Sequence, residues 1–462
     1  MKPIPFSRGD PLGDCARYLP VLRPCATAMR SLTELRSAVN HQYGRVVYRL
    51  GVAAYRHERL PLAEALLRQH LRATRQFDII AERATTGCPN LADYPSFERA
   101  FATLLDRQAQ AWDENRIPLP LFLRDRARPA DPAILAGRSV LVVSPRYVMS
   151  SARYIENDFA DHFTESLRNA GVDAGQFFSD NIAYGDLFAL DPAKAAKDLV
   201  TLREQIAKTK PQILVLEANF VGVGIGLTVA YLNEIKAAFG TKIVAILGDA
   251  WGEYGARAAE YWAPACDVIF HFAPAGDAER KTSFPEKLLC SAVPVNEQNF
   301  YPQEERSYDI SFFGSYGTYL RPFWFACAKR ISKRLGLKTN IRTHQRTADC
   351  PPMREYAAVM RASRVVMNCS SRSPGLRIMT GRVWQALHSG VVLLEEDDEP
   401  TKYFFIPFVH YVPFENARQL GHLIEFFKKN EAWVDRIGVA AADFCRRYYS
   451  SGEIWARVFE TL

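Results

Sequence analysis

One segment constrains the fold of this chain more than any other. Residues 364–395 contain an apolar run, an arginine-rich loop, a short helical pattern, a glycine and a second apolar run. Such an order is typical of a strand, a helix and a parallel strand, because two parallel strands need a crossover connection between them. The segment therefore predicts a βαβ unit and, with it, a parallel sheet.

The helix of this unit has two unlike faces. At the helical spacing i, i+3, i+4 and i+7, one face carries Val383, Ala386, Leu387 and Gly390, and another carries Arg382, Gln385 and Ser389. We expect the apolar face to pack on the sheet, which leaves the polar face free to meet a ligand.

The start of the same helix is suited to an anion. Arg377, Thr380, Gly381 and Arg382 lie in the loop and the first turn. Backbone N–H groups at a helix N-terminus carry partial positive charge, and guanidinium groups bind phosphate in bidentate fashion. The alternative is that these arginines are solvated or pair with acidic side chains.

Similar short apolar runs recur along the chain between helical patterns, which predicts two doubly wound α/β domains. The expected strands of the first lie at 139–144, 213–217, 242–249 and 267–271, with helices at 154–170, 226–239 and 253–262. Those of the second lie near 309–313, 339–343, 364–369, 391–395 and 408–412. The tail from residue 420 to 462 has a helical pattern.

Three segments carry a family resemblance. The run at 381–395 resembles the C-terminal signature of GT-B glycosyltransferases, a glycosyl transferases group 1-like family, and is most similar to its spore-maturation-type members. Residues 308–315, with Arg321 soon after, resemble the first strand and loop of that domain. Residues 293–302 resemble the linker that leaves the N-terminal domain, so the resemblance covers about 138–462.

This resemblance implies a GT-B architecture, in which two Rossmann-like domains face each other across a cleft. Residues 138–302 would form the acceptor domain, 303–450 the nucleotide-sugar domain, and 451–462 a helix that crosses back to the first domain. Residues 1–130 have a helical pattern, and 46–71 are similar to one tetratricopeptide hairpin. A solenoid needs about three repeats, so a helical cap on the enzyme is favoured over a partner-binding array.

Composition narrows the function further. The net charge of +7 is spread over the chain, which disfavours nucleic acid and suits an anionic substrate. The nine cysteines contain no CxxC pair, and Cys266, Cys290, Cys327 and Cys369 have apolar neighbours, as expected of buried thiols in a reducing compartment. Without a signal-peptide pattern or a long apolar run, we expect a cytoplasmic protein or one peripheral to the inner face of a membrane.

The strand ends of the first domain supply the candidates for catalysis. Ligands of open α/β sheets bind outside the carboxyl ends of the strands, where the sequence places Ser144, Glu217, Asp249 and His271. Glycosyl transfer needs a group that accepts the proton of the acceptor hydroxyl. Asp249 is the first candidate for this base and His271 the second, while Ser144 and Glu217 are expected on the acceptor side. Each of these residues has the alternative of a purely structural role.

The donor side is predicted from the second domain. In GT-B enzymes a helix N-terminus and basic side chains, in place of a metal, stabilise the leaving nucleoside diphosphate. The expected donor-binding residues are Gly314, Ser315, Arg321, Arg377, Thr380, Gly381, Arg382, Gln385 and Glu395.

One residue departs from the pattern of the family, and one acidic run resembles a motif of a different glycosyltransferase fold. Gln385 stands where the family commonly has the Glu that accepts hydrogen bonds from ribose, and an amide is a weaker acceptor than a carboxylate. The acidic run at 395–399 imitates a metal motif of the GT-A fold. Because it follows an apolar strand, we expect a solvated loop there, with Glu395 alone facing the nucleotide.

The sequence thus predicts transfer of a sugar from a nucleotide-sugar donor to a glycan, lipid-linked or protein acceptor, with no metal and no cofactor. Two alternatives stay open. A GT-B-fold sugar-nucleotide epimerase would use the same donor pocket. A non-catalytic scaffold with a degenerate donor pocket would bind a protein partner through residues 1–130.

Overall fold

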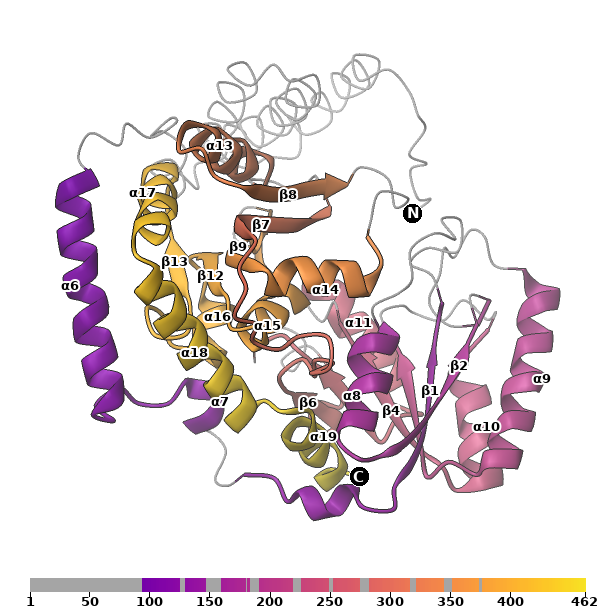
Figure 1. Ribbon diagram of the computed structural model, residues 1–462. Helices are drawn as coiled ribbons and strands as arrows, with labels where there is room; N and C mark the ends of the chain where they lie inside the picture. Colours follow the sequence, from indigo (N-terminus) through magenta and orange to yellow (C-terminus); the bar gives the residue numbers. More distant parts are fainter. Residues whose placement is uncertain are drawn as a thin grey trace, which may run out of the picture.

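The structure is a computed structural model (Figure 1). It describes residues 94–124, 129–146, 159–179, 181–182, 191–218, 226–248, 252–274, 282–315, 321–344, 351–373 and 376–462. The tetratricopeptide-like segment at 46–71 and Asp249 lie outside these residues.

The first domain is built on a six-stranded parallel sheet of order β2-β1-β3-β4-β5-β6. The strands are β1 (Ser139–Ser144), β2 (Asp173–Phe178), β3 (Ile213–Glu217), β4 (Lys242–Leu247), β5 (Val268–His271) and β6 (Leu288–Cys290). One face of the sheet packs on α9 (Pro192–Thr209), α10 (Val229–Phe239) and α11 (Gly252–Trp262). On the other face lie the π-helix η3 (Ala160–Glu165) and α8 (Ser166–Asn169).

The second domain is built on a five-stranded parallel sheet of order β13-β12-β9-β7-β8. Its strands are β7 (Tyr308–Ser315), β8 (Thr339–His344), β9 (Ser363–Asn368), β12 (Val392–Glu396) and β13 (Val412–Phe414). Between them run α13 (Arg321–Arg334), α14 (Met353–Arg361), the hairpin of β10 (Ser371–Ser373) and β11 (Leu376–Arg377), α15 (Gly381–His388) and α16 (Glu399–Phe404). The predicted α/β class with two Rossmann-like, doubly wound domains is confirmed.

Both faces of the second sheet are buried, in two different cores. Val365 and Val392 point into a core that the second domain makes with its own outer helices. Val366 and Leu393, one residue further along the same strands, point into another core that also contains Phe163 and other residues of the first domain. This alternation is the period of two expected of strands, and it joins the two domains through continuous apolar packing.

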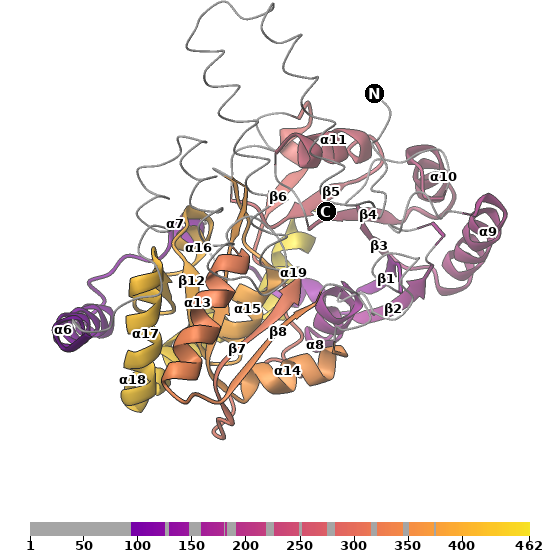
Figure 2. The ribbon, with the colours of Figure 1, turned by 90° about the horizontal axis from the view of Figure 1, so that it is seen from above.

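The helices at the two ends of the described chain each pack on the domain that is distant from them in sequence (Figure 1 and Figure 2). The helix α6 (Tyr94–Asp113) precedes the first domain in sequence but packs on α17 (Ala417–Lys429) of the second, where the rings of Phe101 and Phe426 meet edge to face at 4.8 Å (Figure 1). After α18 (Glu431–Tyr448), the last helix α19 (Ser451–Glu460) lies on the first domain. There the indole of Trp455 donates a 2.8 Å hydrogen bond to the Ser166 hydroxyl.

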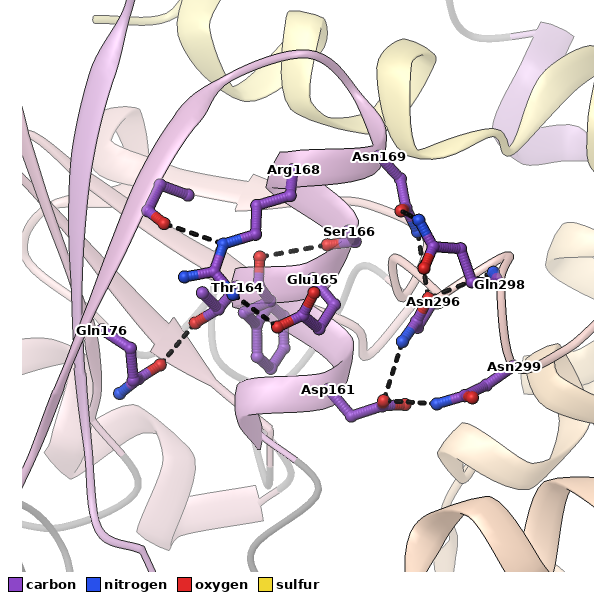
Figure 3. A network of polar contacts seen from close by, with 12 residues as sticks. Asp161, Thr164, Glu165, Ser166, Arg168, Asn169, Gln176, Asn296, Gln298 and Asn299 are labelled. Atoms are coloured by element: carbon purple, nitrogen blue, oxygen red, sulfur yellow. Dashed lines mark hydrogen bonds and ion pairs between the residues drawn. The ribbon is translucent and has the colours of Figure 1, made fainter.

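The linker between β6 and β7 is fixed to the first domain by a network of amide side chains (Figure 3). One carboxylate oxygen of Asp161, in η3, accepts hydrogen bonds from Asn296 at 2.8 Å and Asn299 at 2.6 Å. Asn169, at the end of α8, donates to Asn296 and accepts from Gln298. The linker therefore leaves the first domain at a defined place and angle.

Two further predictions concern cysteines and the membrane. The predicted burial of Cys266, Cys290, Cys327 and Cys369 is confirmed, and all four are free thiols. Within the described ranges, no helix has the length and apolar character needed to cross a bilayer.

Candidate functional site

The second sheet has a topological switch point between β7 and β9. From β7 the chain moves to β8 on one side, and then to β9, β12 and β13 on the other. The crevice between the carboxyl ends of two such strands is where open α/β sheets bind ligands. At this point β7 ends with Gly314 and Ser315, and β9 ends with Asn368.

Arg382 lies at this switch point. It is the second residue of α15, and its guanidinium donates to the Asn368 side-chain oxygen and stacks 4.4 Å from the ring centroid of Phe312. A Cβ atom on Gly314 would lie 2.6 Å from one nitrogen of this guanidinium, so a larger residue at 314 would displace it. The buried Nε–H of Arg382 has no hydrogen-bond partner among the described residues.

Asn368 connects Arg382 to a buried carboxyl group. Its side-chain oxygen accepts from Arg382 and, at 3.4 Å, from the hydroxyl of Thr380, the N-cap residue of α15. Its amide nitrogen donates to one oxygen of Glu395 at 2.7 Å. We call Gly314, Asn368, Thr380, Arg382 and Glu395 the switch-point cluster.

Glu395 is fully buried at the end of β12. Burial raises the pKa of its carboxyl well above the usual range, and the nearby charge of Asp398 raises it further. A protonated Glu395 adds no negative charge beside Arg382. The switch-point cluster then keeps its positive charge for an anionic ligand.

Arg377 has a different environment. Its guanidinium forms a 2.6 Å ion pair with the fully buried carboxylate of Glu396 and also contacts the Ser371 hydroxyl. The predicted pair of phosphate-binding arginines is thus separated, with Arg382 at the switch point and Arg377 engaged with a buried acid. A donor role for Arg377 stays a prediction.

The prediction of a solvated acidic loop at 395–399 is wrong for its first part. Glu395 and Glu396 are completely buried, and Asp398 is almost so. The cause is local, because β12 continues to Glu396 and the Asp398 carboxylate then caps α16 by accepting from the Thr401 N–H at 2.7 Å. Within the described ranges, no three His, Cys, Asp or Glu side chains are grouped so that they could hold a metal ion.

Gln385 contacts the first domain through its side chain. Its side chain is buried, its oxygen accepts a 2.6 Å hydrogen bond from the Tyr356 hydroxyl, and its nitrogen lies 2.9 Å from His162 Nε2. Both ends of the amide are therefore occupied. A contact with ribose would have to use the second amide hydrogen or the second lone pair of the oxygen, because one of each is already used.

Arg321, at the start of α13, is also buried near the switch point. It is 2% exposed and donates a 3.2 Å hydrogen bond to the carbonyl of Cys369, the residue after Asn368. Its charge therefore lies at the end of β9, as does that of Arg382.

In the first domain, Ser144 and Glu217 end neighbouring strands at the switch point between β1 and β3. The register pairs Val143 with Leu216, which places the two residues side by side. His271 ends β5, two strands away from β3, and all three side chains are buried. The structure therefore brings Ser144 and Glu217 together and holds His271 at the same edge of the sheet.

Three residues of this region were not expected from the sequence. Asn368 was identifiable in principle, because it is the polar end of a predicted strand. Tyr356 and His162 gave no such signal, because each meets Gln385 only after folding. His162 contacts it across 223 residues of sequence.

The chain is similar to several solved structures at low sequence identity. They include Anabaena HepE in complex with UDP, at 10% identity and a TM-score of 0.42, covering 70% of this chain and 99% of that one. Sucrose-phosphate synthase from Thermosynechococcus elongatus has 11% identity and a TM-score of 0.43, and an alpha-glucosyltransferase in complex with UDP-glucose and abasic DNA has 12% and 0.45. Each of these two covers 70% of this chain and 98% of its own.

Sequence comparison gives one result for the second domain. The search of curated proteins found no match to the chain. Residues 311–460, about a third of the 462, match the sequence model of a family described as glycosyl transferase-like. This range begins in β7, ends with α19 and contains the whole switch-point cluster. The second domain is therefore similar in sequence to this glycosyl transferase-like family.

Proposed function

We propose that the protein transfers a sugar from a nucleotide-sugar donor to a glycan, lipid-linked or protein acceptor. The observation that carries the proposal is the position of Arg382. It lies in the first turn of α15, at the switch point of a glycosyl transferase-like domain, and its buried Nε–H has no partner among the described residues.

The switch-point cluster suits a diphosphate leaving group. The N–H groups in the first turn of α15 and the Arg382 guanidinium offer hydrogen-bond donors and positive charge to the same place, with the charge of Arg321 close by. Bond breaking in a nucleotide sugar places negative charge on the diphosphate. Fixed donors at that place stabilise the transition state, without a metal ion in this proposal.

The first domain would supply the acceptor site. Ser144 and Glu217 lie together at its switch point and are proposed to bind the acceptor, with Asp249 or His271 as the base for the acceptor hydroxyl. In this scheme Glu395 donates its proton as a hydrogen bond instead of repelling the donor phosphates. Residues Gly314, Ser315, Thr380 and Gly381 would surround the donor with backbone and hydroxyl groups.

Thermal unfolding with a panel of UDP-, GDP-, ADP- and CMP-sugars tests the donor site. A ligand at 100 times its dissociation constant adds about 2.7 kcal/mol to the free energy of unfolding. We expect stabilisation by one nucleotide class, lost in Arg382→Ala and kept in Arg446→Ala; the Arg446 side chain is 67% exposed and pairs with Asp443. Stabilisation by no nucleotide sugar, or equal stabilisation of both variants, would refute the proposed site.

Product analysis separates transfer from the epimerase alternative. The protein is incubated with the stabilising nucleotide sugar, with and without an acceptor mixture. Release of the nucleoside diphosphate only with acceptor supports transfer. A changed sugar on an intact nucleotide would instead show interconversion.

A further inference from the structure

We infer that His162 is a positioning residue, through which the first domain holds the donor-binding helix α15. The inference rests on the proposed function in naming α15 as the donor helix. The contact itself is independent of any ligand, because it is formed by four described residues.

The hydrogen bonds fix the direction of each donor in this contact. His162 Nδ1 lies 2.9 Å from the carbonyl oxygen of Pro294, which can only accept, so Nδ1 carries the hydrogen. In the neutral ring Nε2 is then an acceptor, 2.9 Å from the Gln385 amide nitrogen. The Gln385 oxygen accepts from the Tyr356 hydroxyl at 2.6 Å, so every group in the chain has a compatible role.

His162 reaches this position from a π-helix, a local form that is frequent at functional sites. The preceding residue, Asp161, binds Asn296 and Asn299 of the linker, as Figure 3 shows, while His162 binds the linker carbonyl of Pro294. The helix η3 is thus attached to the linker through two neighbouring residues, Asp161 and His162. The His162 imidazole is thereby held toward the second domain in a fixed orientation.

The imidazole also borders the start of α15. A Cβ atom on Gly381, the first residue of the helix, would lie 3.4 Å from His162 Nε2. The next residue is Arg382, the central donor of the switch-point cluster. His162 therefore binds α15 at Gln385 and lies beside Gly381, about one turn earlier, and so constrains both the position and the tilt of the helix.

Glutamine suits position 385 because of this pair of partners. A side-chain amide accepts a hydrogen bond at one end and donates at the other, as Tyr356 and His162 require. A carboxylate could still accept from Tyr356, but it has no hydrogen for His162 Nε2. The ring would then have to give up its bond to Pro294 or take up a second proton.

Two isosteric variants of the full-length protein test the inference. His162→Gln keeps an acceptor near the position of Nε2, whereas His162→Asn keeps a donor near Nδ1 and loses the contact with Gln385. We expect the dissociation constant of the stabilising nucleotide sugar to rise about tenfold in His162→Asn and to stay within about twofold in His162→Gln. Equal effects of the two variants, or none, would overturn the inference.

A second measurement needs no ligand. Imidazole ¹⁵N–¹H spectra, with His162 assigned by its loss in the variants, report which ring nitrogen carries the hydrogen. We expect the Nδ1–H form in the wild type and its loss in Gln385→Glu; an Nε2–H form in the wild type would overturn the inference. If the wild type binds no nucleotide sugar, the proposed function fails, and the spectra still decide whether the contact exists.

Discussion

The substitution Gly438→Ala should separate α18 from the end of α15. A Cβ atom on Gly438 would lie 2.1 Å from the carbonyl oxygen of Gly390. This distance is 1.3 Å shorter than 3.4 Å, the shortest ordinary van der Waals contact of a Cβ atom. The obstacle is backbone and cannot rotate away. The same oxygen accepts a 2.9 Å hydrogen bond from Arg306, so moving it also breaks that bond.

The expected loss of stability follows from two opposing terms. Inserting a methyl group into a tightly packed site costs about 1–3 kcal/mol, and a clash with backbone belongs at the upper end of that range. Alanine gains about 1 kcal/mol over glycine in a helix interior. We therefore expect Gly438→Ala to lower the free energy of unfolding by about 2 kcal/mol.

Urea unfolding measures this difference, with Gly452→Ala in α19 as the control. A Cβ atom on Gly452 would meet nothing within 4 Å, so only the helix-propensity term applies and the control should be as stable as the wild type or slightly more so. Because Gly390 lies two residues after the end of α15, a displacement of Gly390 should shift this helix, and Gly438→Ala should also weaken nucleotide binding. If Gly438→Ala is as stable as Gly452→Ala, the close approach of α18 to Gly390 is refuted.

Two further predictions concern buried ionisable groups. Burial lowers the pKa of His410 to about 3. Between about pH 6.5 and this value, only the unfolded chain takes up a proton at this residue. The contribution of His410 to the free energy of unfolding therefore falls by about 1.4 kcal/mol for each pH unit of acidification. His410→Asn should remove that slope in urea titrations from pH 7.5 to 5. The readout is the difference between the wild type and the variant. Burial raises the pKa of Glu395 and Asp398, and these groups change the stability with the opposite sign on acidification in both proteins. Arg377→Met leaves the buried Glu396 without its cation and should lower the free energy of unfolding by about 3 kcal/mol. The double variant Arg377→Met with Glu396→Leu should recover most of this loss. A loss of nucleotide affinity with unchanged stability would instead favour a donor role for Arg377.

The strands that the sequence predicts are those with continuous apolar runs. For β3 the predicted 213–217 is the observed range, and β9 and β12 differ from prediction by one residue at each end. The strand β2, with the sequence Asp-Ala-Gly-Gln-Phe-Phe, was missed because it lies at the edge of its sheet and needs fewer apolar residues. Likewise β6 has three residues, too few for a period to be seen, and β13 begins at the last residue of the range predicted for it.

Helix positions were predictable along the chain but their partners were not. The pattern at 154–170 correctly indicated a helical segment, and the described part of it is a π-helix followed by one turn of α8. No periodicity distinguishes the two. The linker partners of Asp161 and His162 in the π-helix lie 135 and 132 residues further along the chain, beyond the reach of a local pattern. The position of α6 on the second domain was equally hidden, because its contacts lie more than 300 residues further along the chain.

In the candidate site, the sequence likewise predicts local features of a residue but not its partners from distant parts of the chain. Arg377 and Arg382 are equivalent in the sequence, each beside the start of one helix, but folding pairs Arg377 with Glu396 and places Arg382 at the switch point. Which arginine meets the buried acid depends on how the β10–β11 hairpin is folded back on the sheet. Gln385 is the extreme case, because a family resemblance assigns it to a ligand whereas its geometry assigns it to His162. A residue on the ligand-facing side of a predicted helix can thus be used to join two domains, and the identity of its partner then explains the amide.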